Sequence, residues 1–286
     1  MQILLLLSFD IEEWFLTHNP EKLPVGQWLN QTKRVEQATR NILGLLSEKK
    51  RKATFFILGW VAENYPHLVK EIASRGHEIG LHSYWHYQTY KQNPNNFELE
   101  LVKGFNLLED ITGKKIKYYR APYFSINEHS SWALPILIKH GIEIDSSIIS
   151  GQRISGKCVP ESPISFSLEN KILIEFPLSR FKIFGISVMY SGSGYFRIMP
   201  YGLLQQILKK SEYDLLYFHP RDFDPQTPWS PSLGLHRNLM NKVGAKGALQ
   251  KFGKLLDQYP SQSLGEATLE FKASKKSLPI ISLPAF

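Results

Sequence analysis

The chain has 286 residues, which is enough for one large domain or two small ones. Hydrophobic residues make up 43% and aromatic residues 13% of it, and this composition excludes an intrinsically disordered chain. The net charge of +8 favours acidic partners through long-range attraction. The basic residues are scattered, however, and their densest cluster, at residues 49–52, closes a predicted helix, which favours a solvated surface over a nucleic-acid patch.

The single cysteine and the apolar start of the chain bear on its location. Cys158 has no partner in the sequence, so an intramolecular disulfide or a thiolate metal cluster is excluded. Residues 3–7 are apolar but run into Asp10 and Glu12 without a basic segment or a cleavage site, which predicts a buried strand rather than a signal peptide. No later stretch reaches the roughly 18 apolar residues of a membrane-spanning helix. We therefore expect a cytoplasmic protein without a transmembrane segment.

Strand-like and helical patterns alternate along the chain. The expected strands are residues 3–9, 53–58, 78–81, 117–120, 142–145, 172–176 and 214–218. The expected helices are residues 32–48, 66–74, 96–112, 131–140, 200–210 and 245–256, and Gly113 is placed to cap the third of them. This alternation predicts an α/β fold with parallel strands, helical crossovers and a ligand site at the carboxyl ends of the strands.

Two segments depart from the alternation. Residues 150–195 are rich in Ser, Gly and Ile, and we expect extended loops or an antiparallel hairpin there. Residues 226–286 are expected to form a C-terminal helix and a tail without recognisable chemistry. No internal repeat or low-complexity linker interrupts the chain, so we expect one domain over residues 1–286.

Carboxylates stand at the end of the first predicted strand. Side chains alternate along a strand, so Asp10 and Glu12 share a face while Glu13 points away. Two carboxylates in one pocket repel each other unless a cation or an arginine lies between them. The alternative is a solvated acidic turn.

Paired histidines follow the third predicted strand. On a helical turn, the Cβ atoms of His82 and His86 would lie roughly 5 to 6 Å apart, which suits two imidazoles on one ion. With a carboxylate such as Glu12 they would form a catalytic metal site with open positions. Histidines on a surface loop are the alternative.

Two further strand ends carry complementary groups. Arg120 can pair with Asp10 and keep it ionised, and His219 is a candidate proton donor because imidazole titrates near neutral pH. Taken singly, Arg120 could bridge surface acids, and His219 before a proline could simply end a strand. Together, four strand ends with complementary chemistry favour an active site.

These residues stand in motifs that resemble those of the polysaccharide deacetylase family, the NodB-homology group also called carbohydrate esterase family four. The motifs are Asp-Ile-Glu (10–12), His-Ser-Tyr-Trp-His (82–86), Arg-Ala-Pro-Tyr (120–123) and Leu-Tyr-Phe-His (216–219), in the family's order. All of these motifs lie within residues 1–225. Ser-Gly-Tyr-Phe-Arg-Ile-Met-Pro-Tyr (193–201) and His-Pro-Arg-Asp-Phe-Asp-Pro (219–225) are similar to the branch encoded near bacterial exopolysaccharide and exosortase loci.

The resemblance implies a distorted (β/α) barrel of about seven parallel strands, and it implies roles for matching positions. Asp10 would be the base, His219 the acid and Arg120 the partner of Asp10, while Asp145 would help to fix the site and the Tyr123 backbone N–H would bind the oxyanion. The metal ligands would be Glu12, His82 and His86, and substrate-binding aromatic residues would be Tyr84, Trp85 and Tyr195. Typical members carry Asp-Asp in the first motif, so Glu12 can bind the metal directly or through water.

The implied activity is removal of acetyl groups from N-acetylated amino sugars of a polysaccharide or oligosaccharide. Metal-activated water would attack, with Asp10 and His219 on opposite sides of it. Zinc is the expected metal, with cobalt, nickel or manganese as alternatives. The competing readings are an amide hydrolase of the same superfamily acting on a small amide, a non-haem iron oxygenase, and an inactive glycan-binding relative.

Overall fold

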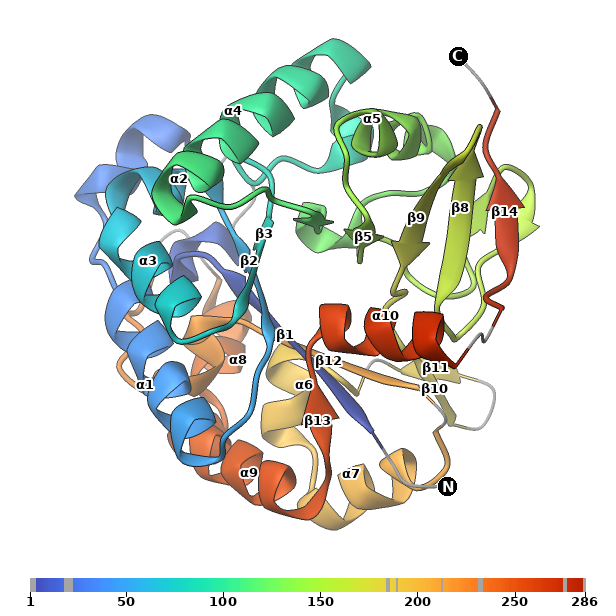
Figure 1. Ribbon diagram of the computed structural model, residues 1–286. Coiled ribbons are helices and arrows are strands. Elements are labelled where there is room, and N and C mark those ends of the chain that lie inside the picture. The colour runs from blue at the N-terminus through green and yellow to red at the C-terminus, as the bar shows by residue number, and fades with distance from the viewer. Residues whose placement is uncertain are drawn as a thin grey trace.

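A mostly parallel sheet flanked by helices organises the chain (Figure 1). The computed structural model describes residues 4–17, 23–183, 186–188, 190–211, 213–230, 234–274 and 277–284. The strands are β1 (Leu5–Ile11), β2 (Thr54–Ile57), β3 (Glu78–Leu81), β4 (Tyr118–Tyr119), β5 (Ile144–Asp145), β6 (Arg153–Ile154), β7 (Lys157–Cys158), β8 (Ile164–Leu168), β9 (Lys171–Glu175), β10 (Phe181–Ile183), β11 (Ile186–Val188), β12 (Asp214–Phe218), β13 (Ser261–Gln262) and β14 (Ile280–Ser282). The α-helices are α1 (Val35–Glu48), α2 (Gly59–Asn64), α3 (Pro66–Ser74), α4 (Pro94–Thr112), α5 (Ala133–Lys139), α6 (Ser193–Ile198), α7 (Tyr201–Leu208), α8 (Leu235–Lys242), α9 (Ala245–Gln258) and α10 (Leu264–Ala273).

Each of the seven predicted strands is present, and together they form a parallel array. The order is β12-β1-β2-β3-β4-β5-β9, and every neighbouring pair is parallel. The array confirms the predicted α/β fold, and Figure 1 shows it curving around a central region with α1, α3, α4 and α5 outside. Among the described strands the sheet does not close, because β12 and β14 end its main path.

The irregular segment after β5 folds into antiparallel hairpins. The pairs β6–β7, β8–β9 and β10–β11 are all antiparallel, as the lack of helix formers predicts. The pair β8–β9 extends the main sheet beyond its parallel part. Strand β14 then adds to β8 in parallel, so the expected tail supplies a strand of the same sheet.

The interior of the curved sheet is closed at the amino ends of its strands by α10. Leu264 of this helix packs in one buried cluster with Leu6, Phe56 and Leu215. The helix begins with a capping box in which Ser263 and Glu266 each accept from the other's backbone N–H. The residues after 264 therefore complete the core, where the sequence analysis expected only a tail.

Gly265 shows how closely α10 approaches the sheet. A Cβ atom built on this residue would lie 2.2 Å from Glu78 Oε1 and 2.5 Å from Tyr118 Oη. Ser263 Oγ and the Gly265 amide both donate to the Glu78 carboxylate, at 2.6 and 3.1 Å. A larger residue fits there only if the hydrogen-bonded Glu78 carboxylate, the Tyr118 side chain or the helix shifts.

An aromatic layer packs between the central strands and α9. The Phe252 ring of α9 lies 6.0 Å from that of Phe9 on β1 and 5.1 Å from that of Phe218 on β12. All three side chains are buried. This layer fixes the two strands that carry Asp10 and His219 relative to each other.

The described helices include none that is long and apolar enough to cross a membrane. The main sheet combines strands from both halves of the chain, since β12 and β13 both pair with β1. The organisation of residues 1–286 as one domain stays a prediction.

Candidate metal-dependent active site

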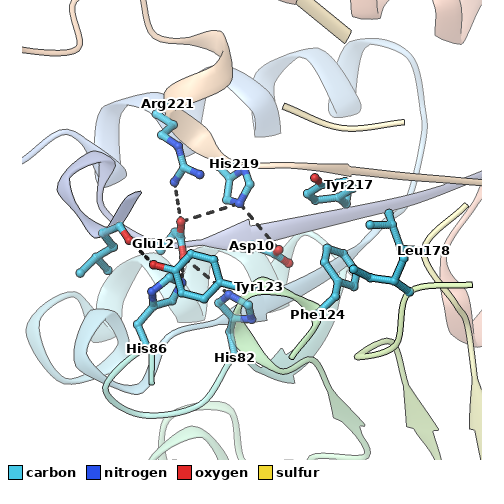
Figure 2. Close-up of a pocket in the computed structure, with 12 residues that line it drawn as sticks. Asp10, Glu12, His82, His86, Tyr123, Phe124, Leu178, Tyr217, His219 and Arg221 are labelled. Atoms are coloured by element: carbon cyan, nitrogen blue, oxygen red, sulfur yellow. Dashed lines mark hydrogen bonds and ion pairs between the residues drawn. The ribbon is translucent and has the colours of Figure 1, made fainter. Parts of the chain in front are cut away.

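The proposed site residues converge at the carboxyl ends of neighbouring parallel strands (Figure 2). Asp10 lies in β1, Glu12 follows β1, His82 follows β3 and His219 follows β12. Because these strands are parallel and close in the sheet order, their ends meet at one edge of the sheet. They line a cavity of about 290 Å³.

Glu12, His82 and His86 form a compact, buried group. Glu12 Oε2 lies 2.5 Å from His86 Nε2 and 3.5 Å from His82 Nε2, and one ligand atom from each residue falls within 4.8 Å of the others. Two ligands at about 2.0 to 2.1 Å from a tetrahedral ion are separated by roughly 3.3 Å. The three side chains therefore fit around one ion with small adjustments.

The second ring nitrogen of His82 supports this use. Nδ1 lies 2.9 Å from the Arg120 carbonyl oxygen, and a carbonyl only accepts. The proton therefore sits on Nδ1, which leaves Nε2 as the ligand atom. No hydrogen bond of good geometry reaches Glu12 Oε2 from the described residues. A buried carboxylate oxygen in that situation is suited to a cation.

The pKa shifts of Glu12 and His86 favour the forms of these two residues that bind metal. Burial alone would raise the pKa of Glu12, but His86 and Arg221 outweigh it and hold that pKa well below its usual value. Burial also lowers the pKa of His86, although Glu12 opposes the shift. A carboxylate and neutral imidazoles are the forms that bind divalent cations.

The loop between the two histidines is strained and not helical. Ser83 and His86 have φ values of 57° and 62°, in the left-handed region. The His86 amide donates to Ser83 Oγ at 3.0 Å, and the Gly59 amide donates to the Ser83 carbonyl at 2.9 Å. The expected helical turn is thus wrong: an irregular loop brings the rings together, with centroids 5.4 Å apart. Such strain is characteristic of functional loops.

Asp10 is paired with Arg120 below the cavity. Arg120 Nη1 donates to Asp10 Oδ1 at 2.8 Å, and both side chains are buried. Arg120 is itself fixed by Ser146, whose carbonyl accepts from Nε at 3.1 Å and whose Oγ accepts from Nη2 at 2.8 Å. Burial would raise the pKa of Asp10, but Arg120, His82 and His219 reverse the shift and lower it. Asp10 is therefore ionised near neutral pH.

Asp145 lies behind this pair and does not reach the cavity. Ser147 Oγ donates to Asp145 Oδ1 at 2.5 Å and accepts from the Ala121 amide at 2.8 Å, so Asp145 supports the segment that carries Arg120. Glu175 on β9 lies beside it and accepts from the Ser147 and Ile148 amides. Burial, and then Asp145, raise the pKa of Glu175 well above its usual range. Glu175 was not identified from sequence.

His219 is held by a residue of its own turn. The 3-10 turn η6 (Pro220–Phe223) brings Asp222 back, so that Asp222 Oδ2 accepts from the His219 amide at 2.8 Å and lies 3.2 Å from Nδ1. Nε2 then faces the cavity, 3.9 Å from Asp10 Oδ2 and 3.7 Å from Glu12 Oε1. Asp10 and His219 are thus neighbours in the cavity, and their placement on opposite sides of a metal-bound water stays a prediction.

Two charged residues of this turn, Arg221 and Asp222, were assigned no role from the sequence. Asp222 fixes His219, and Arg197 lies 3.6 Å from Asp222 on its other side. Arg221 lines the cavity and donates to Glu12 Oε1. The available signal was their position directly after a strand-end histidine, in the motif Arg-Asp that follows His219 and Pro220.

The remaining cavity wall is mostly apolar. Tyr123 stands at the rim, 42% exposed, with its ring 4.8 Å from that of His86 and a left-handed φ of 59°. The other apolar or aromatic lining residues are Leu16, Phe124, Ile149, Leu178 and Tyr217. The Tyr123 backbone as an oxyanion donor stays a prediction.

The three expected sugar-stacking residues do not line the cavity. Tyr84 is fully buried beneath Gly59, so its ring offers no face to a sugar in this structure. Trp85 packs on Trp28, with centroids 6.4 Å apart. Tyr195 is exposed on α6 but away from the described cavity lining. Tyr84 therefore serves packing, and Trp85 packs against the core while it stays partly exposed.

Two sequence profiles match consecutive parts of the chain. Residues 21–143 match the sequence profile described as polysaccharide deacetylase. Over this segment, which is less than half of the chain, the sequence is similar to polysaccharide deacetylases. Residues 146–268 match a second profile, described as a domain of unknown function (DUF3473).

Curated deacetylases are similar to about a third of the chain. A peptidoglycan-N-acetylglucosamine deacetylase of Bacillus cereus is 40% identical over 96 residues, which cover 33% of this chain and 35% of that protein. A peptidoglycan deacetylase of Helicobacter pylori is 32% identical over 108 residues, covering 38% and 36%. The matched region thus spans about a third of these relatives.

Solved structures resemble most of the chain in fold. A putative polysaccharide deacetylase from Mycobacterium smegmatis has a TM-score of 0.66 at 18% identity and covers 99% of this chain and 94% of its own. An allantoinase has a TM-score of 0.61 at 11% identity, with 95% and 91% covered. A family-four pseudoenzyme from Bacillus anthracis has a TM-score of 0.51 at 13% identity, with 93% and 65% covered. At these identities, the likeness concerns fold alone.

Proposed function

We propose that the chain is a metal-dependent hydrolase that removes acetyl groups from N-acetylated amino sugars of a glycan. The observation that carries the proposal is the arrangement in one cavity of the Glu12, His82 and His86 group, the ionised Asp10 and the imidazole of His219. The relatives named as peptidoglycan deacetylases support the acetylated glycan as substrate class.

The donor set fits a divalent cation, with Glu12 Oε2 and the Nε2 atoms of His82 and His86 as ligands. Such a cation supplies a Lewis acid, which activates water and polarises a carbonyl. Zinc is the metal we propose, because two histidines and one carboxylate with open positions suit it. The identity of the metal, the exopolysaccharide branch and the cellular location stay predictions.

The chain's own residues then divide the proton transfers between them. Asp10, ionised and held by Arg120, takes a proton from water as the water oxygen adds to the acetyl carbonyl carbon. The C–N bond breaks as His219 Nε2 delivers a proton to the departing amine, giving acetate and a free amino sugar. Asp222 keeps Nδ1 of His219 occupied, so that Nε2 is the atom directed at the reaction.

The apolar part of the cavity wall suits the acetyl group of the proposed substrate. Phe124 and Leu178 lie beyond Asp10 in the cavity (Figure 2), where the acetyl methyl group can be removed from water. This places the methyl on the side of the cavity away from His86. A small apolar acyl group is therefore better suited to this wall than a charged one.

Acetate release from acetylated amino-sugar oligomers tests the proposal. We expect release with added Zn²⁺, loss with a chelator, and recovery when Zn²⁺, Co²⁺, Ni²⁺ or Mn²⁺ is restored. Asp10→Asn and His219→Ala should abolish release while bound metal persists, whereas His129→Ala, an exposed histidine on another turn, should leave it unchanged. Full activity of both site variants would refute the assignment. Hydrolysis of allantoin in place of the oligomers would favour an amide hydrolase acting on a small ring.

A further inference from the structure

The turn after β12 directs two consecutive charged side chains to different parts of the site. Asp222 turns back to His219, as the two hydrogen bonds to Asp222 Oδ2 show. Arg221 points the other way, and its Nη1 donates to Glu12 Oε1 (Figure 2). The Arg221 side chain is 11% and the Glu12 side chain 2% exposed, so this ion pair is largely removed from water.

The two carboxylate oxygens of Glu12 have different surroundings. Oε1 receives Arg221, and His219 Nε2 lies 3.7 Å from it. Oε2 faces the imidazoles of His86 and His82, at 2.5 and 3.5 Å. A carboxylate next to a cation can use one or both oxygens as ligands, and here one of them is already engaged.

We propose that Arg221 is a positioning residue that holds Glu12 as a one-oxygen metal ligand, with Oε2 on the ion and Oε1 on the guanidinium. The inference rests on the proposed metal site. It also resolves how a glutamate, longer by one methylene than aspartate, can serve as the acidic ligand: the guanidinium takes up the freedom of the longer side chain. An open ligand position is thereby kept for water and substrate.

Charge alone predicts the opposite effect on metal binding. A guanidinium near the ion repels it, so its removal would tighten binding if repulsion were its main effect. A partner that orients a ligand instead typically contributes about 10-fold to 100-fold in metal affinity. The sign of the change in affinity therefore separates the two roles.

The test compares Arg221→Gln and Arg221→Lys with the wild-type chain and with Arg34→Gln. Arg34 also forms an ion pair with a buried carboxylate, donating to Asp224 at 2.7 and 2.8 Å, and it does not line the described cavity, which makes it a matched control. Zn²⁺ affinity is measured by competition with a chromophoric chelator, and zinc coordination by X-ray absorption. Thermal melting of the metal-free proteins verifies that each variant folds.

We expect Arg221→Gln to bind Zn²⁺ about 10-fold to 100-fold more weakly, with one additional oxygen neighbour on the ion because Glu12 becomes bidentate. Arg221→Lys should fall between it and the wild type, and it serves alone if Arg221→Gln does not fold. Arg34→Gln should bind like the wild type. Unchanged or tighter Zn²⁺ binding in a folded Arg221 variant would overturn the proposal. This holds even if the KM of that variant rises.

Neither readout depends on turnover. A wild-type chain that binds Zn²⁺ but releases no acetate would remove the proposed function and leave the role of Arg221 standing. A wild-type chain that binds no divalent cation would remove both.

Discussion

Asp222 is the carboxylate whose removal should have the most informative effect on stability. It is buried, it accepts from the His219 amide at 2.8 Å, and it lies 3.6 Å from Arg197. Burial would raise its pKa, but His219, Arg197 and Arg221 outweigh burial and lower the pKa from 3.8 to about 2. Folding therefore stabilises the ionised form of the Asp222 carboxylate relative to the unfolded chain.

The expected stabilisation follows from the two pKa values. The difference between 3.8 and about 2 corresponds to about 2 kcal/mol in the free energy of unfolding. Because the folded-state pKa is the lower one, this contribution is complete above about pH 4 or 5 and is lost as the pH falls towards 2. About 1 kcal/mol of it should remain at pH 3.

Urea denaturation of metal-free wild type and Asp222→Asn at pH 7, 5 and 3 checks this expectation. The variant should be less stable by about 2 kcal/mol at pH 7 and 5, and the difference should narrow to about 1 kcal/mol at pH 3. Asp257→Asn changes an exposed aspartate in the same way and should match the wild type at each pH. A difference between wild type and Asp222→Asn that is equal at all three pH values would refute the reasoning, because the cost would then not come from the ionised carboxylate.

Three further outcomes concern the core and the metal group. Gly265→Ala should destabilise the protein by about 1 to 3 kcal/mol, since its Cβ would meet the Glu78 carboxylate, and a melting temperature equal to the wild type would contradict the tight contact of α10. Phe252→Ala should cost about 3 to 5 kcal/mol in urea denaturation by emptying the aromatic layer, while a loss below 1 kcal/mol would show that the layer rearranges. Zn²⁺ at about 1,000 times its Kd should stabilise the wild type by about 4 kcal/mol and should not stabilise His82→Ala; equal melting shifts in both would exclude His82 as a ligand.

Local patterns were sufficient to predict the framework of the fold. The seven parallel strands read as short apolar runs with polar ends, and α4 ends at Gly113 with a left-handed φ of 68°, as its capping pattern indicates. The missed helices lacked such a signal or were too short. Helix α2 has six residues, and α10 has weak amphipathic character because its buried residues include Gly265 and Thr268 while Leu269 is exposed. The Ser263 and Glu266 capping box was nevertheless readable in the sequence.

The site residues, like the helices and strands, were predicted only in part. Residues that end strands could be placed at one edge of the sheet, so Asp10, Glu12, His82 and His219 were found. Contacts between turns that are distant in the sequence could not be predicted. The hydrogen bond from Arg221 to Glu12, for example, depends on how η6 lies against β1. The buried position of the Tyr84 side chain likewise follows the left-handed backbone at Ser83, which no local sequence pattern predicts.

The late position of α10 in the chain constrains how this protein can be made. Until residues near Leu264 have left the ribosome, the cluster that contains Leu6, Phe56 and Leu215 lacks the cover that Leu264 and Ala267 of α10 provide. Synthesis therefore passes through a stage in which the sheet can form while its inner surface still exposes apolar side chains to water. Chains at this stage are prone to self-association. A nascent chain stalled shortly before this helix is the form on which a chaperone would act.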